Sequence, residues 1–139
     1  MTTSSHQTQQ ALAPGAGLRW LLYVADAGLL VASGAIHVHL WDIAYQHVKV
    51  LNVLFLVQAA AALVAAVAVL VTRHLLAVIA AALLLAGTIV GFILVRTTGL
   101  FGFHLTFTSG EAYAVLIIEV AAIILLSATA ATLLRDRRS

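Results

Sequence analysis

Apolar residues run almost without interruption through four stretches of this chain, and polar residues gather mainly between them. The four stretches cover residues 18–36, 50–71, 75–95 and 112–134. Each is close to the roughly 20 residues that an α-helix needs to cross a hydrocarbon layer about 30 Å thick. The pattern therefore predicts an all-α membrane protein, with residues 18–139 forming a bundle of four transmembrane helices in up-down order.

The segment before the first stretch, residues 1–17, is rich in Thr, Ser, Gln and Ala and is predicted to be a flexible N-terminal tail. Basic residues near the ends of the spans indicate orientation, because cytoplasmic loops of membrane proteins carry an excess of Lys and Arg. Arg19, Arg73 and the three arginines after the fourth span fall on one side. We therefore expect a multi-pass protein of the plasma membrane with both termini in the cytoplasm and with connections 37–49 and 96–111 facing outward.

Composition narrows the class further. Hydrophobic residues make up 63% of the chain and charged residues 9%, which leaves no room for a soluble domain. The net charge of +2 is too small to indicate nucleic acid, and the lack of cysteine excludes disulfides and thiolate metal sites. The expected partners are the lipid bilayer and either other membrane subunits or further copies of this chain. An enzyme acting alone is not favoured, because no Ser-His-Asp set, phosphate loop or zinc-protease helix motif is present.

The two outer connections carry a second pattern. Residues 36–40 and 101–108 alternate apolar and polar, which is the period of a β-strand and predicts a small outer β-hairpin. The alternative extends the first helix through Trp41 and leaves 101–108 as an aromatic loop at the lipid headgroups. After this loop, Thr108 is predicted to be the N-cap of the fourth helix, with Glu111 returning a hydrogen bond to the cap in a structural role.

Small residues predict where the helices pack. The link 72–74 is so short that the second and third spans must be antiparallel neighbours. Gly87 and Gly91 form a small-xxx-small motif on the third span, which is typical of close helix packing. We expect this motif to act within the chain, and dimerisation is the alternative.

The histidines are the first candidates for chemistry, because most of them fall on the outer side of the predicted bundle. His37 and His39, together with His47, His104 or the carboxylate of Asp42, could bind copper or zinc. Alternatively, His37 and His104 could ligate a non-covalent haem from its two faces, since the chain has no Cys-x-x-Cys-His motif. The plain alternative is a set of interfacial histidines hydrogen-bonded to backbone and headgroups.

Polar residues inside the spans are a second signal, because burying them in lipid is costly and usually has a functional reason. With a rise of about 1.5 Å per residue, several lie within roughly 12 Å of the outer boundary. We predict that they line a pocket opening outward, and the alternative is a structural network that holds the helices in register. The candidate pocket residues are Ser33, Asn52, Gln58, Thr88, Arg96 and Glu119.

Short motifs resemble those of known membrane proteins. Residues 34–37 at the end of the first span and 51–55 at the start of the second resemble small four-helix proteins of the DoxX-like kind. The segments 37–41 and 96–103 resemble uncharacterised actinobacterial membrane proteins. The DoxX-like resemblance implies a helper or subunit in a membrane redox system, and it supplies no catalytic residue.

Three functional hypotheses follow. The first is an integral membrane accessory subunit with an outward-facing histidine-rich site for a metal or haem, serving a redox or metal-handling complex. The second is a purely structural subunit that packs on larger partners. The third is a small transporter or channel using Asp26 and Glu119, which is less favoured because the sequence carries neither an inverted repeat nor an interrupted span.

Overall fold

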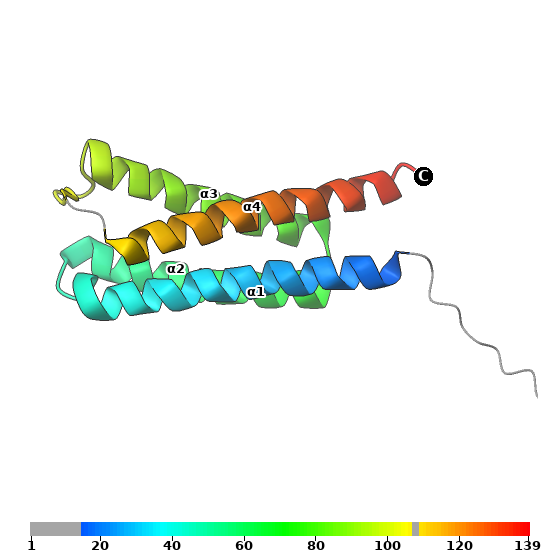
Figure 1. Cartoon of the computed structure of the whole chain (residues 1–139), viewed down its shortest axis with the longest axis horizontal. Coiled ribbons are helices and arrows are strands. Elements are labelled where there is room, and N and C mark those ends of the chain that lie inside the picture. Colours follow the sequence, from blue (N-terminus) through cyan, green and yellow to red (C-terminus); the bar gives the residue numbers. More distant parts are fainter. Residues whose placement is uncertain (1–14, 107–108) are drawn as a thin grey trace, which may run out of the picture.

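The computed structural model describes residues 15–106 and 109–139, and all of their regular elements are helical. Four long helices follow one another up and down (Figure 1). They are α1 (Ala16–Leu40), α2 (Lys49–Thr72), α3 (Leu75–Thr97) and α4 (Gly110–Asp136), and a π-helical turn, η1 (Trp41–Tyr45), continues α1. Each of the four is long and apolar enough to cross a membrane. The predicted multi-pass, all-α architecture is confirmed, whereas most of the predicted N-terminal tail, residues 1–14, lies outside the described residues.

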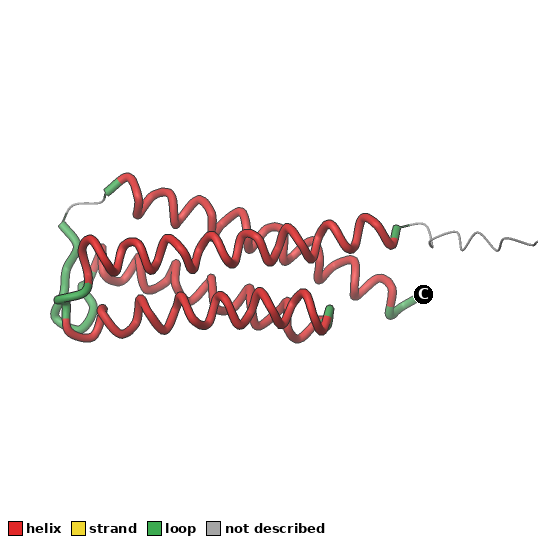
Figure 2. The backbone as a smooth tube through the Cα atoms, turned by 90° about the horizontal axis from the view of Figure 1, so that it is seen from below, coloured by secondary structure: helices red, strands yellow, loops and turns green. Residues whose placement is uncertain are grey.

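The start of α1 and the end of α4 meet at one end of the bundle, opposite the end where the longer loops lie (Figures 1 and 2). An ion pair of 2.5 Å between Arg19 Nη1 and Asp136 Oδ2 joins them. The guanidinium of Arg73, in the α2–α3 turn, lies 5.1 Å from the ring centre of Trp20 in α1. The arginines used to predict orientation therefore do share one end, although the side of the membrane that this end faces stays a prediction.

The helices pack in a ring in which α1 contacts α2 and α4, and α3 contacts α4 and α2. A close backbone approach in this ring is at Gly34 of α1. A Cβ there would lie 3.2 Å from the carbonyl oxygen of Ala59 and 3.5 Å from the Cβ of Ala62, both in α2. Because a backbone oxygen cannot move aside easily, the α1–α2 contact depends on glycine at this position.

The α2–α3 hairpin is tight at one end and open at the other. Only Arg73 and His74 separate the two helices, which are antiparallel as predicted, but they lie apart at the opposite end of the bundle (left in Figure 1). The close packing within the chain that we predicted for Gly87 and Gly91 is not present, because a Cβ at either position would meet nothing within 4 Å. The motif is typical of close helix packing, but neither glycine is needed for a close contact within this chain.

The outer end differs from the predicted hairpin. The prediction of the first strand is wrong, since residues 36–40 continue α1. A helix satisfies its backbone hydrogen bonds internally, which membrane depth favours over an isolated strand pair. In the other segment, Leu100 and Phe103 form one isolated bridge, and residues 107–108 lie outside the described residues. The predicted N-cap Thr108 is among them, and the cap described for α4 is Ser109, whose Oγ accepts from the Ala112 amide at 3.3 Å.

Candidate functional site

A buried histidine forms the centre of the polar group in the outer half of the bundle. His37, in the last turns of α1, is 4% exposed. Its Nδ1 lies 2.8 Å from the carbonyl oxygen of Ser33, one helical turn earlier. Since a carbonyl oxygen only accepts, Nδ1 carries the hydrogen in this contact, and the neutral ring then presents Nε2 as an acceptor.

The carboxyl group of Glu119 lies beside this histidine. Its Oε1 accepts a 3.2 Å hydrogen bond from the Ser33 hydroxyl, so α1 and α4 are joined across their interface. The same oxygen is 3.9 Å from His37 Nε2, which is close for two ionisable groups but longer than a hydrogen bond. Ser33, His37 and Glu119 are all buried. Ionisable side chains at this depth are rare and usually functional.

A cavity of about 480 Å³ adjoins this cluster, and its wall is mainly apolar. Five lining residues have polar side-chain groups, one from each long helix and one from η1: His37, Gln58, Thr88, Glu119 and Tyr45. The Thr88 hydroxyl donates to the Leu84 carbonyl within its own helix at 3.1 Å. Gln58 Nε2 is buried and has no hydrogen-bond partner among the described residues. Three of the six predicted pocket residues, Gln58, Thr88 and Glu119, therefore line one cavity, and the Gln58 amide has an unsatisfied donor.

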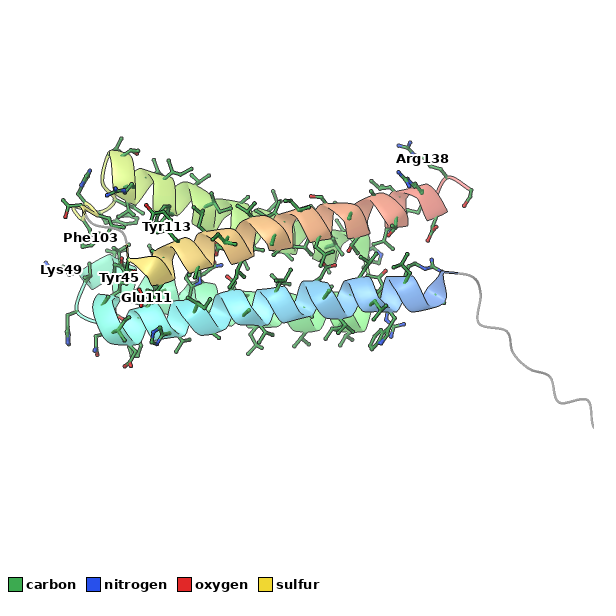
Figure 3. All side chains as sticks on the ribbon, in the orientation of Figure 1. Tyr45, Lys49, Phe103, Glu111, Tyr113 and Arg138 are labelled. Carbon is green, nitrogen blue, oxygen red and sulfur yellow. The ribbon has the colours of Figure 1, made fainter. Side chains whose placement is uncertain are left out.

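An aromatic cluster lines the cavity near the longer loops of the bundle. The rings of Tyr45 and Phe55 stack with centres 4.4 Å apart, and Phe103 approaches the Tyr45 ring edge-on at 5.9 Å. All three line the cavity. Figure 3 shows Tyr45 and Phe103 together at the loop end of the bundle, far from Arg138. The sequence did not predict this cluster, because its three residues come from η1, α2 and a loop.

Three other predicted pocket residues have different roles. Ser33 supports Glu119 but does not line the cavity. Asn52 Oδ1 accepts a 2.7 Å hydrogen bond from Trp41 Nε1, which ties η1 to α2. Arg96 was expected to reach toward Glu119, but its Nη1 donates to the carbonyl oxygens of Leu105 and Thr106 at 3.1 and 2.9 Å. This guanidinium therefore holds the outer loop and adds no charge to the cavity wall.

The residues of the predicted histidine site do not form one cluster in the structure. His39 and Asp42 are exposed, and so are His47, between η1 and α2, and His104 in the outer loop. His104 Nε2 lies 3.2 Å from the Thr97 carbonyl oxygen. Within residues 15–106 and 109–139, no group of three or more His, Cys, Asp and Glu side chains is arranged to hold a metal ion. Metal or haem binding stays a prediction, and of the four histidines proposed for it only His37 lines the cavity.

Asp26 lies in a separate buried contact. The Thr129 hydroxyl donates to Asp26 Oδ2 at 2.7 Å, which joins α1 to α4 nearer the end at which α1 begins and α4 ends. Seven residues, or about 10 Å of helix, separate Asp26 from Ser33. The fully buried Leu30 lies between them, and Asp26 does not line the cavity.

Comparisons with protein-family models, curated proteins and solved structures gave no match to this chain. The resemblance to DoxX-like and actinobacterial membrane proteins therefore stays a prediction.

Proposed function

We propose that this protein is an integral membrane binding protein that holds a small, mostly apolar molecule in the outer half of its helix bundle. The observation that carries the proposal is the cavity of about 480 Å³ beside His37 and Glu119. Ligand sites in proteins are typically cavities of roughly 300–1,000 Å³ with apolar walls and a few convergent polar groups. The wall described above has this composition.

The unsatisfied amide of Gln58 supports a bound molecule over an empty packing defect. A buried donor without a partner costs about 1–3 kcal/mol, and a ligand acceptor would remove this cost. A purely structural network would be expected to pair this group with another side chain. The same argument favours ligand binding over the purely structural subunit.

For the wider role, we propose an accessory subunit of a redox or metal-handling complex in the plasma membrane. The exposed apolar side chains along all four helices are consistent with contact with lipid and with other membrane subunits. If a haem or metal is bound, His37 is the ligand we expect, because its ring borders the cavity. A Soret band or stoichiometric metal that disappears when His37, His39 and His104 are changed together to Ala would support that version.

Gly91→Leu tests the binding function, because the new side chain would occupy part of the cavity and reduce the space for a ligand. Gly91 lines the cavity and nothing lies within 4 Å of its would-be Cβ. We expect added membrane lipid extract to raise the Tm of delipidated wild-type protein by several degrees, through binding to the folded state, and to leave the Tm of Gly91→Leu unchanged.

Gly28→Leu is the matched control. Gly28 is exposed on α1, has the same open space around it and does not line the cavity. It should respond to the extract as the wild type does. Equal stabilisation of Gly91→Leu and wild type would contradict the binding function, and failure of Gly91→Leu to fold would favour the structural subunit.

A further inference from the structure

The exposed part of the cavity wall lies between α2 and α3. Among the residues that line the cavity, those exposed are Leu54 of α2 and Leu83 and Gly87 of α3. Leu54 is 39% exposed and Leu83 is 67% exposed. The cavity thus has a side opening, which we call the α2–α3 mouth, defined by Leu54, Leu83 and Gly87.

The α2–α3 mouth faces the hydrocarbon layer. It lies on two helices of spanning length, and both exposed side chains at its rim are leucines. The rings of Tyr45, Phe55 and Phe103 line the cavity and contact one another near the longer loops. A molecule dissolved in the bilayer would reach the cavity through this mouth without crossing water.

We propose that the ligand is a bilayer-dissolved amphiphile with an uncharged hydroxyl head group and a long aliphatic tail, which enters through the α2–α3 mouth. This inference rests on the proposed binding function and adds the chemistry of the ligand and its route. The head group meets Gln58 and the His37–Glu119 pair, and the tail lies along the leucines toward the mouth.

The polar groups on the wall select the head group. Gln58 Nε2 needs an acceptor, and His37 Nε2, in the tautomer set by the Ser33 carbonyl, needs a donor. A hydroxyl group supplies both, since it has lone pairs and one hydrogen. An ammonium group has no lone pair for Gln58. A carboxylate has no hydrogen for His37, and the lining residues include no Lys or Arg to balance its charge.

Photoreactive probes test the head group. Hexadecanol, hexadecanoic acid, hexadecylamine and hexadecane, each carrying the same diazirine on the tail, would be dissolved in phosphatidylcholine vesicles containing the full chain. After illumination, labelled peptides are quantified by mass spectrometry. We expect the alcohol to label peptides of the cavity wall about tenfold more than the acid, the amine or the alkane does, which corresponds to about one hydrogen bond.

Gln58→Leu keeps the side-chain bulk but removes the amide. It should reduce labelling by the alcohol several-fold, with the remaining preference over the alkane due to His37, and leave labelling by the alkane unchanged. Equal labelling of the cavity by all four probes would overturn the head-group inference and leave the proposed function intact. A stronger signal from the acid or the amine would replace the hydroxyl with that group. No cavity labelling by any probe would overturn the proposed function as well.

Spin labelling tests the α2–α3 mouth. Because the chain has no native cysteine, each nitroxide attaches only at the introduced cysteine. Nitroxides would be attached at Gly87→Cys, at Gly28→Cys on the exposed face of α1, and at Lys49→Cys at the start of α2. We expect oxygen, which concentrates in lipid, to relax the label at position 87 as strongly as at position 28, and a water-soluble nickel chelate to relax only the label at position 49. Strong relaxation of the position-87 label by the chelate would show an opening to water and overturn the bilayer route.

Discussion

Individual residues decide how closely the helices approach and which polar groups remain unpaired. Ser33 and Gly34 are adjacent on α1, but Ser33 bonds to Glu119 of α4 and Gly34 packs on α2. A polar residue in a predicted span indicates a buried polar contact or a binding site at that position. It does not indicate its partner, because partners come from other helices. Glu119 was predicted as a pocket residue, but the sequence did not predict its hydrogen bond to Ser33. Arg96 was also predicted to line the pocket, but it bonds to the loop between α3 and α4.

Gly34→Leu tests the close contact between α1 and α2. Because its Cβ would lie 3.2 Å from the Ala59 carbonyl oxygen, α1 and α2 would have to move apart, and overpacking of this kind costs about 1–3 kcal/mol. The free energy of unfolding in mixed detergent micelles with increasing sodium dodecyl sulfate measures this loss. Gly28→Leu, on an open face of the same helix, should lie within about 0.5 kcal/mol of wild type. Equal stability of the two variants would contradict the account of the α1–α2 contact.

At the scale of elements, apolar length predicted the four helices well, because a span must satisfy its backbone within itself. The helix ends and the outer connections were harder to predict. Alternation over residues 36–40 is the period of a strand, but continuity with α1 decided the structure, since those residues extend an existing helix. The cap of α4 was also displaced: the motif supported Thr108, whereas Ser109 has the extended backbone and the hydrogen bond of an N-cap.

Ser109→Ala tests this cap. The Ala112 amide would lose its acceptor, and removing an N-cap hydroxyl costs about 1 kcal/mol. Amide hydrogen exchange should become faster in the first turn of α4 and stay unchanged in its middle. Ser127→Ala removes a hydroxyl that donates to the Ile123 carbonyl on an exposed face and should leave exchange in the first turn unaltered. Unchanged exchange in Ser109→Ala would assign the cap to another residue.

For the whole molecule, the arrangement of the helices brings the start of α1 to the end of α4 and also forms the cavity. Both features depend on several helices together and cannot be predicted from one span alone. The sequence predicted that Gln58, Thr88 and Glu119 lie at similar depth, and the bundle does bring them to one wall. It could not predict the separation of α2 and α3, because Gly87 and Gly91 are equally compatible with a close contact and with an open space.

The orientation prediction belongs to this scale. The basic end of the bundle, with Arg19, Arg73 and Arg135, should face the cytoplasm because of the positive-inside rule. A green fluorescent protein fused after Ser139 should therefore be bright, and alkaline phosphatase fused at the same position should be inactive. The reverse result would place the cavity and its aromatic cluster on the cytoplasmic side. A fusion within the 96–111 connection should give the opposite pair of signals.

The central claim is that the cavity beside His37, Gln58 and Glu119 holds a small, mostly apolar molecule. Native mass spectrometry of the protein released directly from its own membranes tests this claim most directly. The account predicts one organic adduct of lipid-like mass per chain, which is present in Gly28→Leu and absent in Gly91→Leu. A bare chain in all three samples would contradict the account. An adduct with the mass of haem or a metal ion, lost in His37→Ala but kept in Gly91→Leu, would replace it with the histidine-centred alternative.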